Sequence, residues 1–360
     1  MRKSDYKSVK LMLLGGESCP SAGLSFARKI KMIRNLSVFS IFGFFVITSF
    51  TFAGPVFPDL KVVPWNGHKA ATSLTFDDGD PSHLDVVVPE LNQRKMHGTF
   101  YLIANKIDRK DEWRKILLAG HEIGNHTLDH KHANELTPKD EEAQVAGAKN
   151  VLQKEFGIPV LTFAYPFVEI SPGLKTNVEK THLLARGGYG TYVMKPEVEP
   201  DWMNIPSQTT MTNLTFDTYK TWIDDDVTGG GWLVWMIHGL EGTPWGWNPI
   251  TKKVFTQILD YLQAKDIWVG TFLEVGSYFR AQKVFEKALT QAGDNEKTLK
   301  WQIPQYFPDN VLLKIQADGI KDGFEFWQGK QKITADEKGF YPIVFNRGEL
   351  TLKVLTTPQK

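Results

Sequence analysis

Two short stretches of the sequence contain side chains of the types that can hold a divalent metal ion and activate water. Thr75-Phe76-Asp77-Asp78-Gly79 places two carboxylates after an apolar run, and its glycine permits a sharp turn. His126-Thr127-Leu128-Asp129-His130 places two imidazoles at positions i and i+4. Two nitrogen ligands, one carboxylate ligand and a second carboxylate acting as a base are what a metal-dependent hydrolase needs. The two stretches therefore predict a reaction type, provided that folding brings them together.

The expected orientation of these side chains follows from simple backbone geometry. Neighbouring side chains diverge on an extended strand, so one of the two aspartates can bind a metal while the other faces a substrate. On a helix, His126 and His130 would lie on one face with Cβ atoms about 5–6 Å apart, able to share one ion. Asp-Asp-Gly also fits an ordinary turn, and paired histidines also occur on surfaces. Metal binding therefore depends on the convergence of both stretches.

The bulk composition describes an ordinary globular protein. The 360 residues are 42% hydrophobic and 23% charged, which suits one long domain or two shorter ones. A net charge of +1 argues against a nucleic-acid partner or an anionic membrane bound by charge alone. The 11 Trp, 10 Tyr and 23 Phe supply core material and also rings on which sugars can stack.

The N-terminal region has the pattern of an export signal. Arg28, Lys29, Lys31 and Arg34 precede an apolar stretch over residues 36–52, and Thr51-Phe52-Ala53 suits cleavage before Gly54. We expect residues 1–53 to be a leader, either cleaved or kept as a membrane anchor, with Met32 as an alternative start. The membrane is a partner only if the anchor is retained. The single cysteine, Cys19, lies in this leader, so the exported protein would have no disulfide. These features predict a periplasmic, cell-surface or secreted protein.

From residue 71 onward, strand patterns and helix patterns alternate. Strands are predicted over residues 71–76, 98–104, 160–165, 232–237 and 267–271, and helices over 84–94, 111–119, 138–156 and 253–263. The third helix has the clearest ends, with Thr137 as N-cap, Asp140 three residues later and Gly157 after the last turn. Repeated strand–helix units imply a parallel sheet covered by helices, open or closed into a barrel. Candidate reactive residues follow the strands, where barrel active sites are built.

The pattern changes after about residue 282. Strands are predicted over residues 312–317, 323–327, 341–346 and 349–355, and Asp-Gly, Gln-Gly and Arg-Gly turns separate them. This pattern is typical of a small β-sandwich and contains no chemical motif. We therefore expect a catalytic domain over residues 54–281 and a β-sandwich accessory domain over residues 282–360.

In combination, the two metal-binding motifs point to a known family. Thr-Phe-Asp-Asp-Gly, followed about fifty residues later by Gly-His-Glu-Ile-Gly-Asn-His-Thr-Leu-Asp-His, resembles the polysaccharide deacetylases of the NodB-homology type, carbohydrate esterase family 4. The resemblance covers about residues 68–280. It implies a distorted (β/α) barrel and metal-dependent removal of acetyl groups from a polysaccharide. Carried over by position, Asp77 is the general base, while Asp78, His126 and His130 bind a divalent metal, expected to be Zn²⁺.

The third family motif departs from the usual pattern. Family members commonly have Arg-Pro-Pro-Tyr-Gly, whereas this chain has Ala164-Tyr165-Pro166-Phe167-Val168. The arginine that would pair with the base is missing, so we expect a less strongly lowered pKa for Asp77. The backbone N–H of Phe167 can still donate to an oxyanion, and Tyr165 is expected to contact substrate.

The remaining motifs concern the general acid and the sugar. Asp201-Trp202 loosely matches the pair that supports the acid, and His238, after the strand 232–237, is the acid by resemblance. Trp202, Trp245 and Trp247 are candidates to contact a sugar ring, although the last two also suit packing against the barrel rim.

The motifs leave the substrate open. N-acetylglucosamine units are the expected substrate, but O-acetyl esters on a xylan-like glycan would need the same chemistry. A protein of a different class, which binds carbohydrate without catalysis on the same scaffold, is suggested by the missing arginine and the added β-domain. The complete set of metal ligands together with His238 favours the enzyme.

Overall fold

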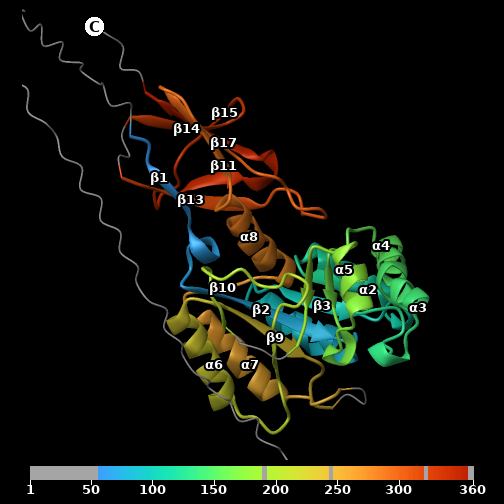
Figure 1. Ribbon diagram of the computed structural model, residues 1–360. Helices are drawn as coiled ribbons and strands as arrows, with labels where there is room; N and C mark the ends of the chain where they lie inside the picture. Colours follow the sequence, from blue (N-terminus) through green and yellow to red (C-terminus); the bar gives the residue numbers. More distant parts are fainter. Residues whose placement is uncertain (1–55, 189–192, 243–245, 320–322, 356–360) are drawn as a thin grey trace, which may run out of the picture. The chain divides into compact units, whose positions relative to one another are not determined.

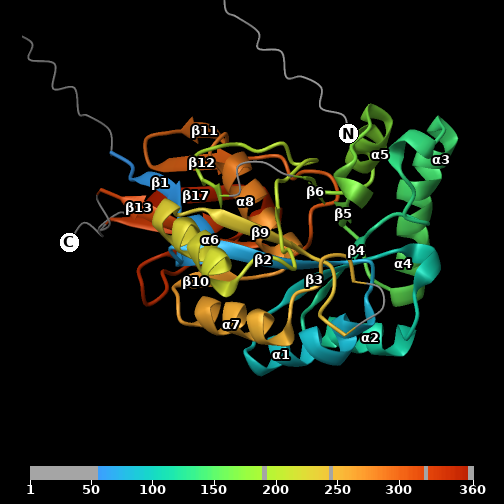
Figure 2. The same ribbon diagram turned by 90° about the horizontal axis from the view of Figure 1, so that it is seen from below.

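The computed structural model describes residues 56–188, 193–242, 246–319 and 323–355. The expected leader over residues 1–53, its cleavage site and Trp245 lie outside these ranges. The helices and strands named below are drawn in Figures 1 and 2.

A mainly parallel sheet forms the centre of the fold. Its strands run in the order β6-β5-β4-β3-β2-β9-β7, and β10 pairs with the first part of β2. The strands are β2 (Ala70–Asp77), β3 (Gly98–Leu102), β4 (Glu122–Asn125), β5 (Thr162–Ala164), β6 (Leu184–Arg186), β7 (Val193–Met194), β9 (Trp232–Ile237) and β10 (Ile267–Val269). The five strands predicted from the sequence are among them. All parallel partners end at one edge, which gathers the residues that follow each strand.

The sheet curls until its two sides are linked. Ile205 forms a bridge with Arg186 at the end of β6, and β8 (Gln208–Thr209) pairs with β9. Residues 205–209 thus connect the β6 side to the β9 side, and side chains from these distant strands face a common interior. The prediction of an α/β fold with a distorted barrel is confirmed.

Strand β2 explains how polar residues are accommodated in this interior. All eight of its residues are buried. The hydroxyls of Thr72 and Thr75 donate to the carbonyl oxygens of Leu233 and Trp235 on the neighbouring strand β9. Each buried hydroxyl therefore has a partner, which avoids the cost of an unsatisfied polar group.

Helices cover the sheet, and α6 and α7 pack against one another beside β2 and β9 (Figure 1). The helices are α1 (Val88–Gln93), α2 (Lys110–Leu118), α3 (Pro138–Glu142), α4 (Ala148–Phe156), α5 (Pro172–Glu179), α6 (Phe216–Gly229), α7 (Lys252–Gln263) and α8 (Phe272–Phe285). The predicted capping box at Thr137 and Asp140 is confirmed. Wide π-helical turns over His83–Val87 and Ala143–Gly147 interrupt two of the predicted helices. Within the described ranges, no helix is both long and apolar enough to span a bilayer.

The C-terminal part contains two antiparallel sheets. One has the order β1 (Asp59–Val62), β13 (Leu312–Asp318), β16 (Tyr341–Val344). The other has the order β11 (Leu289–Ala292), β12 (Glu296–Lys300), β17 (Glu349–Val354), β14 (Phe324–Gln328), β15 (Gln331–Ile333). Leu313 and Ile343 of the first share one apolar core with Leu350 and Leu352 of the second. Helix α8 continues across the expected boundary at residue 282, and β1 pairs with β13, so segments from both sides of that boundary build this core.

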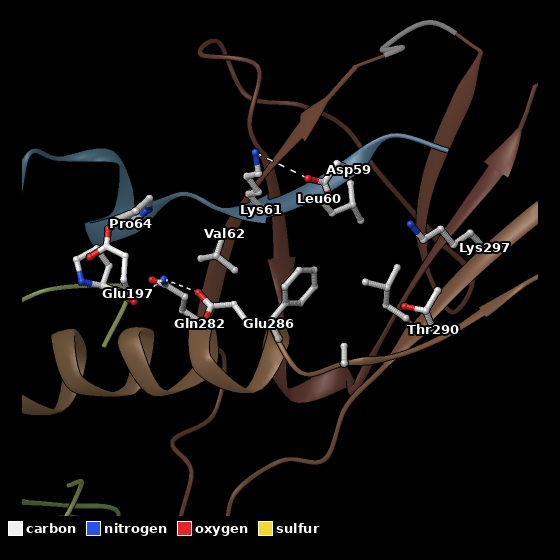
Figure 3. A pocket seen from close by; sticks show the side chains of 14 residues that line it. Asp59, Leu60, Lys61, Val62, Pro64, Glu197, Gln282, Glu286, Thr290 and Lys297 are labelled. Carbon is white, nitrogen blue, oxygen red and sulfur yellow. Dashed lines mark hydrogen bonds and ion pairs between the residues drawn. The ribbon is translucent and has the colours of Figure 1, made fainter. Parts of the chain in front are cut away.

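A groove of about 380 Å³ lies between β1, α8 and the hairpin of β11 and β12 (Figure 3). Its floor is apolar, with Val62, Phe285 and Leu299 buried. On its walls, Gln282 donates a hydrogen bond to Glu286, and Lys61 lies 3.8 Å from Asp59. None of its lining residues belongs to the cavity at the strand ends described below.

Asp226, on helix α6, is a buried carboxylate outside that cavity. Neither oxygen accepts a well-formed hydrogen bond within the described residues. Burial raises the pKa of Asp226 to about 8, and the nearby backbone amide of Leu233 lowers that pKa only in part. Because the unfolded pKa is about 3.9, the native state retains a proton that the unfolded state loses between about pH 4 and pH 8. The contribution of Asp226 to stability is therefore fully present below about pH 4 and is lost as the pH rises from there through about 8.

We expect Asp226→Asn to stabilise the protein at alkaline pH. The free energy of unfolding, measured with urea, should rise by about 1–3 kcal/mol at pH 8 and change little at pH 4. Asp309→Asn, at an exposed position, is the control and should stay within about 0.5 kcal/mol at both pH values. An equal effect of Asp226→Asn at both pH values would contradict the raised pKa.

Candidate active site

The end of strand β2 carries the two candidate carboxylates, Asp77 and Asp78. Asp77 is its last residue and is 1% exposed, whereas Asp78 begins the turn that follows. Asp78 and Gly79 both have φ of 71°, a left-handed conformation that turns the chain sharply. The two carboxylates therefore leave the strand end in different directions.

The segment that carries the histidines is a loop after strand β4, so the prediction of a helix over residues 126–130 is wrong. The Asn125 side chain accepts a hydrogen bond from the Thr127 amide, and the Thr127 hydroxyl accepts one from the His130 amide. Thr127 and His130 both have left-handed backbones, with φ of 67° and 59°. These side-chain bonds replace helical ones and fold the loop back on itself. The side chains of His126 and His130 still converge, but from a loop and not from a helix.

Asp78, His126 and His130 converge from these two segments. Their ligand atoms lie within 4.8 Å of one another, and theirs is the cluster with metal-binding geometry found in the described part of the chain. Asp78 Oδ1 lies 3.5 Å from His126 Nε2 and 3.3 Å from His130 Nε2. A tetrahedral ion with ligand bonds of about 2.0–2.1 Å separates its ligand atoms by about 3.3 Å.

Two further observations fit a metal ion at this cluster. Asp78 Oδ1 is buried and accepts no well-formed hydrogen bond from a described residue. His126 Nδ1 lies 2.9 Å from the Ala164 carbonyl oxygen, to which it donates, so Nε2 keeps its lone pair for a ligand. The donor set of two imidazoles and one carboxylate is one that zinc and similar ions accept.

The charges in the site keep the carboxylates ionised. Burial acts to raise the pKa of Asp77, but neighbouring positive charges, Arg186 first, lower it overall. Burial likewise acts to raise the pKa of Asp78, and the histidines beside it lower it well below its usual range. Burial and the charge of His126 lower the pKa of His130 to about 4. His130 is therefore neutral near pH 7 and able to act as a ligand.

Arg186 corrects the expectation that Asp77 has no cationic partner. From β6, its guanidinium donates to Asp77 Oδ1 at 2.8 Å and to Oδ2 at 2.6 Å, and both side chains are 1% exposed. The expectation of a less strongly lowered Asp77 pKa is therefore wrong as well, because a cation is present. The sequence carried a signal for this residue: Arg186 ends the apolar run Leu183-Leu184-Ala185 and precedes two glycines.

His238 follows strand β9 and faces the same carboxylate. Its Nε2 lies 4.0 Å from Asp77 Oδ2, and its ring contacts Trp247 edge-on at 4.8 Å. Burial lowers its pKa, although Asp77 and Asp78 act in the opposite direction. Asp201, the residue expected to support this histidine, pairs with Lys175 in the structure.

These side chains line a cavity of about 300 Å³ at the strand ends. Its walls are Asp77, Asp78, His126, His130, Tyr165, Phe167, Val168, Met236, His238 and Trp247. Phe167 and Trp247 are each 49% exposed, whereas Tyr165 is buried. The prediction for Trp202 is wrong, because its ring packs against Phe279 and does not line this cavity. Trp245 lies outside the described residues.

The turn that carries Phe167 has an unusual backbone. Phe167 and Val168 have φ of 54° and 64°, and a β-branched residue such as Val168 seldom adopts such a value. Val168 stands where the family commonly has glycine, and its side chain packs over Gly188. Left-handed backbone costs a residue with a Cβ about 1–2 kcal/mol, so this turn stores strain beside the site.

We expect Val168→Gly to be more stable than Val168→Ala. Both variants lose the packing over Gly188, but only alanine keeps a Cβ in the left-handed conformation. The glycine variant should unfold with a free energy about 1 kcal/mol higher, by urea denaturation. At an ordinary helical position glycine is the less stable of the two by about 0.5–1 kcal/mol. That ordinary ranking at position 168 would show that the turn is not strained.

Comparisons with known proteins agree with the motifs. Residues 66–184 match the family described as polysaccharide deacetylase. A peptidoglycan-N-acetylglucosamine deacetylase from Bacillus cereus is 30% identical over 135 residues, which cover 37% of this chain and 60% of the relative. A gellan lyase from a Bacillus species is 25% identical over 264 residues, covering 67% of this chain and 10% of the relative. This chain thus spans about three fifths of the deacetylase and a tenth of the lyase.

Solved structures include a distant match. A family 4 acetyl xylan esterase from Clostridium thermocellum, in complex with cobalt, has 21% identity and a TM-score of 0.43, covering 57% of this chain and 89% of that one. In this chain, the curled α/β sheet gathers carboxylates and histidines at its strand ends. The family match is more specific. Over residues 66–184, the chain is similar to the polysaccharide deacetylases.

Proposed function

We propose that this protein is a metal-dependent deacetylase that hydrolyses the acetamido groups of a polysaccharide containing N-acetylglucosamine. One observation carries the proposal: Asp78, His126 and His130 converge within 4.8 Å, while Asp77 lies beside them without joining them. A divalent cation, with Zn²⁺ expected, would supply Lewis acidity for the water nucleophile and the acetyl carbonyl. The names of relatives that act on N-acetylglucosamine in peptidoglycan support the substrate class.

The residues around the cluster suit the proton transfers of amide hydrolysis. Asp77 is ionised and fixed, so it can take a proton from the attacking water. The Phe167 amide lies on the turn lining the cavity, where it can donate to the acetyl oxygen as negative charge develops. His238 lies beside Asp77 and can give a proton to the leaving nitrogen. Because its pKa is lowered, its protonated form is a stronger acid than an ordinary histidine.

The rim of the cavity suits a sugar ring. Tyr165, Phe167 and Trp247 line it, and aromatic faces pack well against the C–H faces of sugars. The half-exposed rings of Phe167 and Trp247 are the accessible ones, so we assign the stacking contact to them. Tyr165 would act from the wall of the cavity.

The activity test is acetate release from defined substrates. Protein treated with a chelator and then reloaded with ZnCl₂ or CoCl₂ should release acetate from N-acetylglucosamine oligomers or from peptidoglycan. Chelated protein without added metal should release none. Release from acetylated xylan alone would move the substrate class to O-acetyl esters. Glycan binding without acetate release from any substrate would favour the non-catalytic alternative and overturn the proposal.

The proposal also concerns location. A polysaccharide substrate and the signal-like pattern before residue 54 agree with export to the periplasm, the cell surface or the medium. The proposed function requires no nucleic-acid partner. Fractionation of cells expressing the full chain would test the location, and retention in the cytoplasm would contradict it.

A further inference from the structure

Arg186 is a buried arginine whose hydrogen bonds go to one carboxylate and one hydroxyl. It donates two bonds to Asp77 and one, at 2.8 Å, to the hydroxyl of Thr75. Its Nε has no hydrogen-bond partner within the described residues. The guanidinium also lies over the ring of Tyr101, with its centre 5.2 Å from the ring centroid. Asp77 is therefore the carboxylate that both nitrogens of the guanidinium bond.

The position of Arg186 in the sheet explains the altered third motif. Arg186 on β6 is the register partner of Ala164 on β5, the position where family members commonly have arginine. The arginine of this chain is thus on the adjacent strand, at the same height along the barrel axis as position 164. The bridge between Arg186 and Ile205 links β6 to the side of the barrel that contains β9 and β2. From there an inward side chain reaches Asp77 across the interior.

We propose that Arg186 is the positioning residue for Asp77 and that it replaces the cation absent at position 164. This inference rests on the proposed deacetylase function. The two parallel bonds hold both oxygens of Asp77, which keeps this carboxylate beside the metal ligands. Asp77 Oδ2 already lies 4.0 Å from His126 Nε2, and carboxylates are good zinc ligands. Without Arg186, Asp77 would turn toward the metal and become a fourth ligand.

A purely stabilising role explains the arrangement less well. Removing two charges from water costs so much that a buried ion pair is often no more stable than apolar residues of similar volume. Ala164 is fully buried, and its small side chain occupies the position of the family's arginine. Arg186 has another use for its charge, because the carboxylate that it holds is the proposed base.

The central test compares Arg186→Met with the wild type. Arg186→Met should lower kcat for acetate release by about 100-fold and leave KM within about threefold, because substrate contacts are unchanged. With Co²⁺ in the site, its visible absorption spectrum should change, since Asp77 joins the ligands. Arg280→Met is the matched control, a half-buried arginine on α8 that bonds the Leu183 carbonyl, and it should change neither value.

Relocating the arginine provides the second test. In Arg186→Ala/Ala164→Arg, the cation returns to the usual family position on the adjacent strand, and kcat should recover at least about tenfold over Arg186→Ala alone. A merely structural arginine would not be rescued in this way. If Arg186→Met and Arg186→Ala do not fold, the double variant and Arg186→Lys are compared with the wild type instead, and the double variant should be the more active of the two. Lysine keeps the charge but loses the paired bonds, so kcat should fall by at least about tenfold.

The outcomes separate this inference from the proposed function. A wild type that releases acetate together with a folded Arg186→Met that retains full kcat and an unchanged cobalt spectrum overturns the inference alone. A folded double variant no more active than Arg186→Ala also counts against it. A wild type without activity on any glycan overturns the proposed function, while the cobalt spectra still report whether Arg186 keeps Asp77 off the metal.

Discussion

Asp77→Asn is expected to abolish acetate release while the protein still binds its metal. An amide cannot accept the proton from water, and removing a general base typically costs about 10²–10⁴-fold in rate. The cost here should lie near the upper end, because the other described carboxylate that lines the cavity, Asp78, belongs to the proposed metal cluster. Metal content by elemental analysis should remain at the wild-type level, since Asp77 is not one of the three ligands.

The stability of this variant must be measured along with its rate. Although asparagine has nearly the shape of aspartate, Asp77→Asn leaves the Arg186 charge buried without its partner, which costs about 3–5 kcal/mol. Asp77→Asn/Arg186→Met removes both charges and should recover part of that stability without recovering activity. Asp111→Asn, on the exposed surface of α2, is the control and should behave as wild type. Full activity in folded Asp77→Asn would show that the base is a different residue.

The sequence predicted the strand ends well because they depend on local apolar runs. The runs before Asp77 and His238 are long and bordered by turns, so β2 and β9 were found close to their actual limits. The capping box at Thr137 and Asp140 is equally local, since both partners lie within one helical turn. Each such feature can be read without knowing the rest of the fold.

The errors arose where spacing has two structural solutions. Histidines at i and i+4 fit one face of a helix, but here the Asn125 and Thr127 side chains bond nearby amides and impose a loop. Both solutions bring the two imidazoles together, so the candidate metal cluster did not depend on which one occurs. The spacing alone favours the helix, and only the competing side-chain bonds exclude it.

Contacts between distant segments could not be predicted in this way. Arg186 bonds Asp77, 109 positions away, because the sheet curls and residues 205–209 link its two sides. Likewise, Lys61 on β1 pairs with Asp318 on β13, 257 positions away. A local pattern indicates that β6 ends in arginine but not which carboxylate it meets. For the same reason, the motif comparison found the usual arginine missing and could not find its replacement.

His126→Ala is expected to remove the metal and, with it, the stability that the metal provides. His126 is 1% exposed, and its Nδ1 is fixed by the Ala164 carbonyl, so its Nε2 is the most rigidly placed of the nitrogen ligands. Removing an outer partner of a metal ligand typically weakens binding about 10–100-fold, and loss of a ligand should exceed that. ZnCl₂ at about 1,000 times its Kd should stabilise the wild type by about 4 kcal/mol.

This stabilisation gives a measurement that does not depend on knowing the glycan. The melting temperature of chelated wild type should rise when ZnCl₂ is added, whereas that of His126→Ala should stay almost constant. His68→Ala, an exposed histidine that pairs with Asp266, should respond as wild type does. Zinc-dependent stabilisation that survives in both His126→Ala and His130→Ala would place the metal elsewhere. Because the proposed chemistry needs the ion between Asp78 and these histidines, that result would also remove its physical basis.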